Sequence, residues 1–230
     1  MWLVVGGPLS GMDCRIALIH ALAQSVAPIN DALARDWPQA QRMNLLDDSL
    51  SADLAAGGGA PDDAMTARFI ALADYAAGTG ADAILFTCSA FGSCIEAAAR
   101  RHAGIPVLKP NEAMIEEAVA RGQRIGLLAT FAPTLASMPR EFPAGTALEC
   151  SLIDGALEAL QRGDAETHDQ LAADASVLLQ DAGCQAIALA QFSLARAAPA
   201  IARRTGLPIL TTVDSAVRAL RKRLAGRTTA

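Results

Sequence analysis

The chain has 230 residues, of which 52% are hydrophobic and 4% aromatic, and its formal net charge is −5. This length allows one large domain or two small ones, and the hydrophobic content is ample for a buried core. An acidic chain with few aromatic residues lacks the basic surface of nucleic-acid-binding proteins, so we expect no nucleic-acid partner.

The five cysteines are odd in number, widely scattered and contain no Cys-x-x-Cys pair. This pattern predicts a reducing, cytoplasmic location, with neither a disulfide framework nor a zinc site. Residues 1–11 are mildly apolar but lack the basic residues of a signal peptide and are too short to span a membrane. We expect them to be a leader without an assigned role, and we expect no membrane partner.

Strands and helices alternate along the first half of the chain. Buried apolar runs predict strands at residues 15–20, 41–46, 84–87 and 104–109. Between them we expect helices that end near Arg35, Ala77 and Arg101, with a glycine-rich loop at 57–63 before the second helix. This alternation predicts a parallel α/β fold, with ligands bound at the carboxyl ends of the strands.

The same order of segments recurs roughly a hundred residues later in the chain. The matching pairs begin at Arg15 and Arg124, Leu45 and Leu152, Ala83 and Ala186, and Gly104 and Gly206. We therefore predict two pseudo-symmetric Rossmann-like halves, each a four-stranded parallel sheet flanked by helices, with a cleft between them. The first half comprises residues 12–109 and 211–230, and the second comprises residues 110–210.

The stretch Thr87-Cys88-Ser89 stands where a buried strand gives way to a helix. Backbone N–H groups and the helix dipole favour negative charge at such a place, which suits a thiolate or an anionic substrate. The alternative is that Cys88 is a small buried hydrophobic residue, as free cysteines often are.

The repeat places a counterpart opposite each of these residues, and Cys88 falls opposite Gln191. If the two halves face each other about a pseudo-twofold axis, the strand ends line one cleft, a favoured kind of ligand site. The expected lining is His20, Ser25, Thr87, Cys88 and Ser89 from the first half, and Thr130, Thr134, Gln191, Phe192 and Ser193 from the second.

With its duplicated α/β layout, Thr87-Cys88-Ser89, the segment from Ala129 to Thr134 and the final Leu210-Thr-Thr-Val-Asp, the chain resembles the aspartate/glutamate/hydantoin racemase superfamily. That superfamily also holds maleate isomerase and arylmalonate decarboxylase. The resemblance implies catalysis without a metal or organic cofactor, by one cysteine from each half acting on opposite faces of the substrate. It also implies that Thr130 and Thr134 lie where the carboxylate binds, with helix capping as the alternative role.

Cys88 matches the first cysteine position of these racemases, whereas Gln191 occupies the second. A carboxamide neither takes up nor delivers a proton readily. If racemisation occurs, another acid or base must replace the second thiol, and His20 and His168 are the candidates, with helix capping or a surface position as the alternative for each.

We therefore expect a cofactor-independent enzyme of the racemase or isomerase type, acting on a small carboxylate-bearing, amino-acid-like substrate through a single cysteine. The alternatives are a one-base decarboxylase, a lyase or an amide hydrolase on the same scaffold, or a non-catalytic carboxylate-binding protein. The resemblance also makes a homodimer an open possibility.

Overall fold

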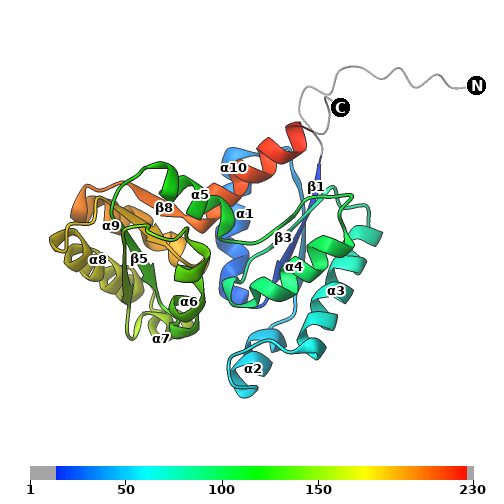
Figure 1. The fold of residues 1–230 in the computed structure, drawn as a ribbon, viewed down its shortest axis with the longest axis horizontal. Helices are drawn as coiled ribbons and strands as arrows, with labels where there is room; N and C mark the ends of the chain where they lie inside the picture. Colours follow the sequence, from blue (N-terminus) through cyan, green and yellow to red (C-terminus); the bar gives the residue numbers. More distant parts are fainter. Residues whose placement is uncertain (1–13, 227–230) are drawn as a thin grey trace, which may run out of the picture.

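The computed structural model describes residues 14–226, which form two α/β lobes set side by side (Figure 1). Residues 1–11, for which we expected a leader, lie outside the described residues. Each lobe contains a four-stranded sheet in which every pairing is parallel. Since all strands of a parallel sheet end at the same edge, each lobe presents one edge of loops to the other.

The sheet of the first lobe has the strand order β2-β1-β3-β4. Its strands are β1 (Arg15–His20), β2 (Gln41–Leu46), β3 (Ala83–Phe86) and β4 (Val107–Leu108). The two inner strands, β1 and β3, are apolar and almost entirely buried, as a strand covered on both faces must be.

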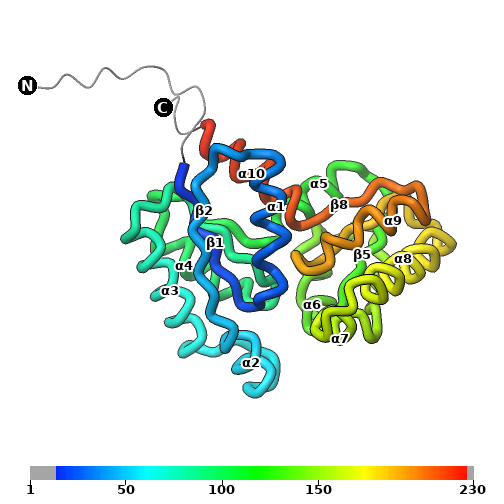
Figure 2. Tube along the Cα trace, turned by 180° about the vertical axis from the view of Figure 1, so that it is seen from behind, coloured from blue at the N-terminus to red at the C-terminus, as the bar shows by residue number. Residues whose placement is uncertain are grey.

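Helices cover both faces of this sheet. They are η1 (Ala23–Ser25), α1 (Val26–Asp36), α2 (Ser49–Ala56), α3 (Asp63–Gly78), η2 (Ser89–Phe91), α4 (Gly92–Arg101) and, from the end of the chain, α10 (Thr212–Ala225). Helices α1 and α10 lie together on one face, as Figure 2 shows. They bury Leu33 and Leu220 against Leu18. Helices α3 and α4 pack on the other face around Phe69 and Phe86.

The sheet of the second lobe repeats this arrangement with the order β6-β5-β7-β8. Its strands are β5 (Ile125–Ala129), β6 (Leu148–Leu152), β7 (Ala186–Leu189) and β8 (Ile209–Thr211). Its helices are α5 (Glu112–Ala120), α6 (Ala132–Ser137), η3 (Met138–Glu141), α7 (Ala156–Gln161), α8 (Ala165–Asp181), η4 (Ser193–Ala197) and α9 (Ala198–Thr205). The predicted pair of four-stranded parallel sheets flanked by helices is confirmed.

Three local expectations need correction. Helix α2 was not predicted, and the fourth strand is only Val107–Leu108, because Pro106 has no N–H to extend the ladder. The helix after Cys88 begins at Gly92, since a 3-10 turn, η2, comes between them. Cys88 therefore caps a 3-10 turn and not an α-helix.

The lobes also make contact away from the strand ends. Phe192, which follows β7 of the second lobe, is buried in the core of the first lobe with Ile29 and Val213. In addition, Glu117 of α5 accepts hydrogen bonds from Arg218 of α10 at 2.6 and 2.8 Å. Within residues 14–226, no helix is long and apolar enough to span a membrane.

Candidate functional site

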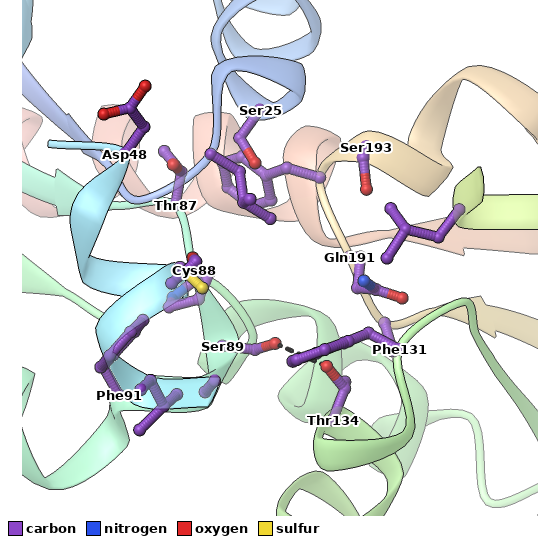
Figure 3. Close-up of a pocket in the computed structure, with 18 of the residues that line it drawn as sticks. Ser25, Asp48, Thr87, Cys88, Ser89, Phe91, Phe131, Thr134, Gln191 and Ser193 are labelled. Atoms are coloured by element: carbon purple, nitrogen blue, oxygen red, sulfur yellow. Dashed lines mark hydrogen bonds between the residues drawn. The ribbon is translucent and has the colours of Figure 1, made fainter. Parts of the chain in front are cut away.

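A cavity of about 310 Å³ lies between the two lobes, where the strand ends meet (Figure 3). Eight of the eleven residues that we expected at the site line it. They are Ser25, Thr87, Cys88 and Ser89 from the first lobe, and Thr134, Gln191, Phe192 and Ser193 from the second. The fold thus brings together residues that are more than a hundred positions apart in the sequence.

Cys88 lies at the end of β3, and its side chain is partly exposed. Burial raises the pKa of the Cys88 thiol to about 11, although hydrogen bonds from the Ala90 N–H and the Ser51 hydroxyl oppose that rise. The single proton of the Ser51 hydroxyl is donated to the carbonyl oxygen of Ala21 at 2.8 Å, so the hydroxyl must turn toward the sulfur before it can donate to a thiolate. At neutral pH Cys88 is therefore a thiol. A thiolate formed there would accept from the Ala90 N–H and, once it has turned, from the Ser51 hydroxyl.

Gln191 faces Cys88 from the equivalent position at the end of β7 (Figure 3). Its Oε1 accepts hydrogen bonds from the backbone N–H of Thr130 at 2.6 Å and from the Thr130 hydroxyl at 3.1 Å. A backbone N–H only donates, so the atom of Gln191 that meets it must be the oxygen. The amide NH₂ is therefore left to face the cavity as a donor.

Thr130 itself does not line the cavity, contrary to our expectation that it contacts the substrate. It lies behind Gln191 and orients the carboxamide. Thr134 does line the cavity, and its hydroxyl lies 3.4 Å from that of Ser89 in the other lobe. These two hydroxyls meet across the boundary between the lobes.

His20 is placed differently from the expectation that it faces the cleft. Its side chain is fully buried at the end of β1, with Nδ1 2.9 Å from Thr87 Oγ1 and Nε2 2.9 Å from Asn44 Oδ1. Burial lowers the pKa of His20 below its ordinary value, although the hydrogen bond with Asn44 opposes this shift. His20 is a neutral residue behind Thr87 and does not line the cavity.

His168 is also absent from the cavity lining. It is fully buried on α8, where Nδ1 lies 2.8 Å from Asp169 Oδ1 and Nε2 has no hydrogen-bond partner. Asp169 in turn accepts from Arg196 of η4 at 2.9 Å, which ties α8 to the segment after Gln191. The structure does not place His168 where a second acid or base would act.

Helix α2 contributes lining residues that the sequence analysis missed. Asp48, just before α2, and Ser51, Ala52, Leu54 and Ala55 on it form one wall of the cavity. The sequence signal for this short amphipathic helix is the pair Leu50 and Leu54. These residues are one helical turn apart, and both are buried.

The cavity is mainly apolar. Phe91, Phe131, Leu22 and Leu157 contribute to its walls. Within the part of the chain that the structure describes, no Lys, Arg or His lines it, and Asp48 is its only charged side chain. Among these same residues, no group of three or more His, Cys, Asp or Glu is arranged to hold a metal ion.

This architecture is similar to that of solved racemases and of a solved decarboxylase. Allantoin racemase from Klebsiella pneumoniae superposes with a TM-score of 0.71 at 17% identity, over 92% of this chain and 88% of the other. Glutamate racemase RacE1 from Bacillus anthracis gives 0.70 at 13% identity, over 93% and 82%. Unliganded arylmalonate decarboxylase gives 0.61 at 17% identity, over 93% and 94%.

Sequence identities this low show a shared fold, but they do not show a shared reaction or substrate. At the level of sequence, the profile described as Asp/Glu/Hydantoin racemase matches residues 23–220. A search of curated proteins gave no match.

Proposed function

The chain belongs to the Asp/Glu/hydantoin racemase family, and from this premise we propose that it is an enzyme that transfers a proton at the carbon next to the carboxylate of a small, amino-acid-like substrate. Cys88 carries the proton, and neither a metal nor an organic cofactor takes part. The observation that supports this most strongly is the opposition of Cys88 and Gln191, from equivalent strand ends, across one cavity.

The reaction uses one face of the substrate. Gln191 cannot exchange a proton at neutral pH, but its NH₂ group can donate to a carboxylate oxygen. When the α-proton leaves, negative charge moves onto that oxygen, and a donor already aimed at it stabilises the resulting enediolate. Cys88 supplies the acid or base, and Gln191 supplies the electrostatic stabilisation.

The protonation state of Cys88 at neutral pH favours one type of reaction over another. Because burial raises its pKa to about 11, the thiol is ready to give a proton, whereas it must first lose one to act as a base. This favours, as a second candidate, decarboxylation of a malonate-type acid. There the C–C bond to the leaving carboxylate breaks, CO₂ departs, the electron pair stays on the enediolate, and the Cys88 thiol protonates the carbon; solvent then restores the thiol proton.

The experiment is a screen of amino acids, hydantoins and malonates against wild type and Cys88→Ala, with chiral detection of products. Wild type should convert at least one compound, and Cys88→Ala should lose at least about a thousandfold in kcat/KM on it. Cys150→Ala is the matched control, since Cys150 is an exposed thiol outside the cavity. Full turnover by Cys88→Ala would refute the role of Cys88.

A further inference from the structure

The hydroxyl of Thr87, next to Cys88, ends a chain of hydrogen bonds that starts at a main-chain carbonyl. The Nδ2 of Asn30 lies 2.8 Å from the carbonyl oxygen of Val26. A carbonyl oxygen only accepts, so this atom of Asn30 must be the nitrogen. The same Nδ2 lies 2.8 Å from Oδ1 of Asn44, which is therefore an acceptor.

The next link is His20. Its Nε2 lies 2.9 Å from the same Asn44 Oδ1 and must carry the proton that it donates there. A neutral imidazole has one N–H, and the fully buried His20 is neutral because burial lowers its pKa. Its Nδ1 is then a bare acceptor, 2.9 Å from Thr87 Oγ1.

The Thr87 hydroxyl must donate its single proton to that nitrogen. The other acceptor within reach, the carbonyl oxygen of Ile19, is farther away at 3.4 Å. With its proton committed to His20, the Thr87 oxygen can only accept a hydrogen bond from anything in the cavity. Gln191 has the opposite role. Its oxygen already accepts from the Thr130 N–H, so only its NH₂ group faces the cavity, and that group can only donate.

We propose that His20 is a positioning residue that fixes the hydrogen-bond polarity of the cavity, so that Thr87 accepts from the ligand while Gln191 donates to it. The ligand that fits is a carboxylate whose α-carbon bears an N–H donor, with an apolar side chain against the walls of the cavity. This inference rests on the proposed function only in taking the cavity as the substrate site.

Two substitutions of His20 separate this role from a structural one. In His20→Asn, the side-chain oxygen takes the place of Nδ1 and still accepts from Thr87. In His20→Gln, the amide nitrogen reaches toward Asn44 in the place of Nε2, but the acceptor beside Thr87 is lost. Thr87→Val removes the hydroxyl at constant shape, and Thr87→Ser keeps it. Thermal unfolding of each variant controls for folding.

The readout is binding selectivity, measured by calorimetry with each enantiomer of phenylalanine and with 3-phenylpropanoate, which lacks the amino group. Wild type, His20→Asn and Thr87→Ser should bind the preferred phenylalanine about tenfold more tightly than 3-phenylpropanoate. In His20→Gln and Thr87→Val this ratio should fall to about one, with the affinity for 3-phenylpropanoate unchanged.

Three results would overturn the proposal: equal binding of the probes by wild type, binding of neither probe, or a wild-type ratio in both His20→Gln and Thr87→Val. Because the measurement needs no turnover, it fails or succeeds independently of the chemistry assigned to Cys88. If the His20→Gln and Thr87→Val variants kept the wild-type selectivity while turnover still depended on Cys88, the role of His20 would be rejected and the proposed function would stand.

Discussion

Cys88 and Gln191 occupy the same place in the two repeated lobes, yet they give the cavity two different chemical faces. The thiol can carry a proton, and the carboxamide cannot. What Gln191 contributes is decided by a neighbour, because the Thr130 N–H holds its oxygen and turns its NH₂ toward the cavity. The chemical role of Gln191 thus depends on the main-chain N–H of Thr130 as well as on the residue itself.

Replacing Gln191 by Glu tests that assignment. The variant keeps an oxygen for the Thr130 N–H but presents a second oxygen, and a negative charge, to the cavity. We expect the affinity for 3-phenylpropanoate to fall at least about tenfold, since a donor becomes a like charge. Thr130→Val, which keeps the backbone N–H, should change this affinity by less than about threefold. Unchanged binding by Gln191→Glu would show that the carboxylate lies elsewhere.

The pKa of Cys88 predicts how its alkylation depends on pH. Since burial raises that pKa to about 11, the thiolate fraction should rise about tenfold for each pH unit between about 7 and 10. The rate of iodoacetamide labelling, followed by mass spectrometry on the peptide that contains Cys88, should rise in parallel. Ser51→Ala removes a hydrogen bond to the thiolate and should slow labelling at pH 8. A plateau below pH 9 would contradict the assignment.

At the scale of elements, the strand ends could be predicted and the wall opposite them could not. Buried strands leave apolar runs that a sequence shows directly. Strands β1 and β2 have the predicted bounds, and β3 begins and ends one residue earlier than predicted. Helix α2 is short and mostly exposed, so its apolar pattern comprises little more than Leu50 and Leu54. For that reason Asp48 and Ser51 were missed.

Helix α3 offers a test of local stability, because its first turn is capped by a side chain. The Oδ1 of Asp62 accepts from the N–H of Met65 at 2.7 Å. Asp62→Ala should lower the free energy of unfolding by about 1 kcal/mol, whereas Asp62→Asn should preserve most of it, because asparagine caps equally well. Urea denaturation measures both variants. Equal losses in the two variants would show that the charge, and not the cap, is what matters.

At the scale of the whole molecule, the internal repeat is what made the site predictable. It predicted two similar sheets and paired Cys88 with Gln191. The directions of side chains lay beyond it, since they depend on tertiary partners such as Asn44 for His20 and Asp169 for His168. Both histidines were expected at the cavity, but both are buried in the surrounding structure and neither lines it.

The contact between α5 and α10 predicts how one contribution to the free energy of unfolding depends on pH. Burial alone would raise the pKa of Glu117, but hydrogen bonds from Arg218 and Ser215 outweigh it and hold the pKa below its ordinary value of 4.5. The ionised Glu117 therefore stabilises the folded protein above pH 4.5. This stabilisation is lost as the pH falls through the lowered pKa of Glu117.

Glu117→Gln should accordingly lower the free energy of unfolding at pH 7 by up to about 1 kcal/mol, because the pair is partly exposed. The difference from wild type should shrink as the pH falls below 4.5 and through the lowered pKa of Glu117. Glu116→Gln, at an exposed neighbouring position, is the control and should have no effect. A difference that stays constant down to the lowest pH at which both proteins remain folded would rule out the charge of Glu117 as its source.

The central claim is that one thiol moves the proton on one face of the substrate. The most direct test uses a chiral substrate or product from the screen that carries an α-proton. This compound is incubated with the enzyme in deuterated water, its configuration is followed by chiral separation, and its deuterium content is followed by NMR. We predict that wild type incorporates deuterium with retention of configuration and that Cys88→Ala incorporates none. Gln191→Cys, which has a second thiol opposite the first, should incorporate deuterium and also invert the centre. Inversion by wild type at the same rate as deuterium incorporation would contradict the central claim.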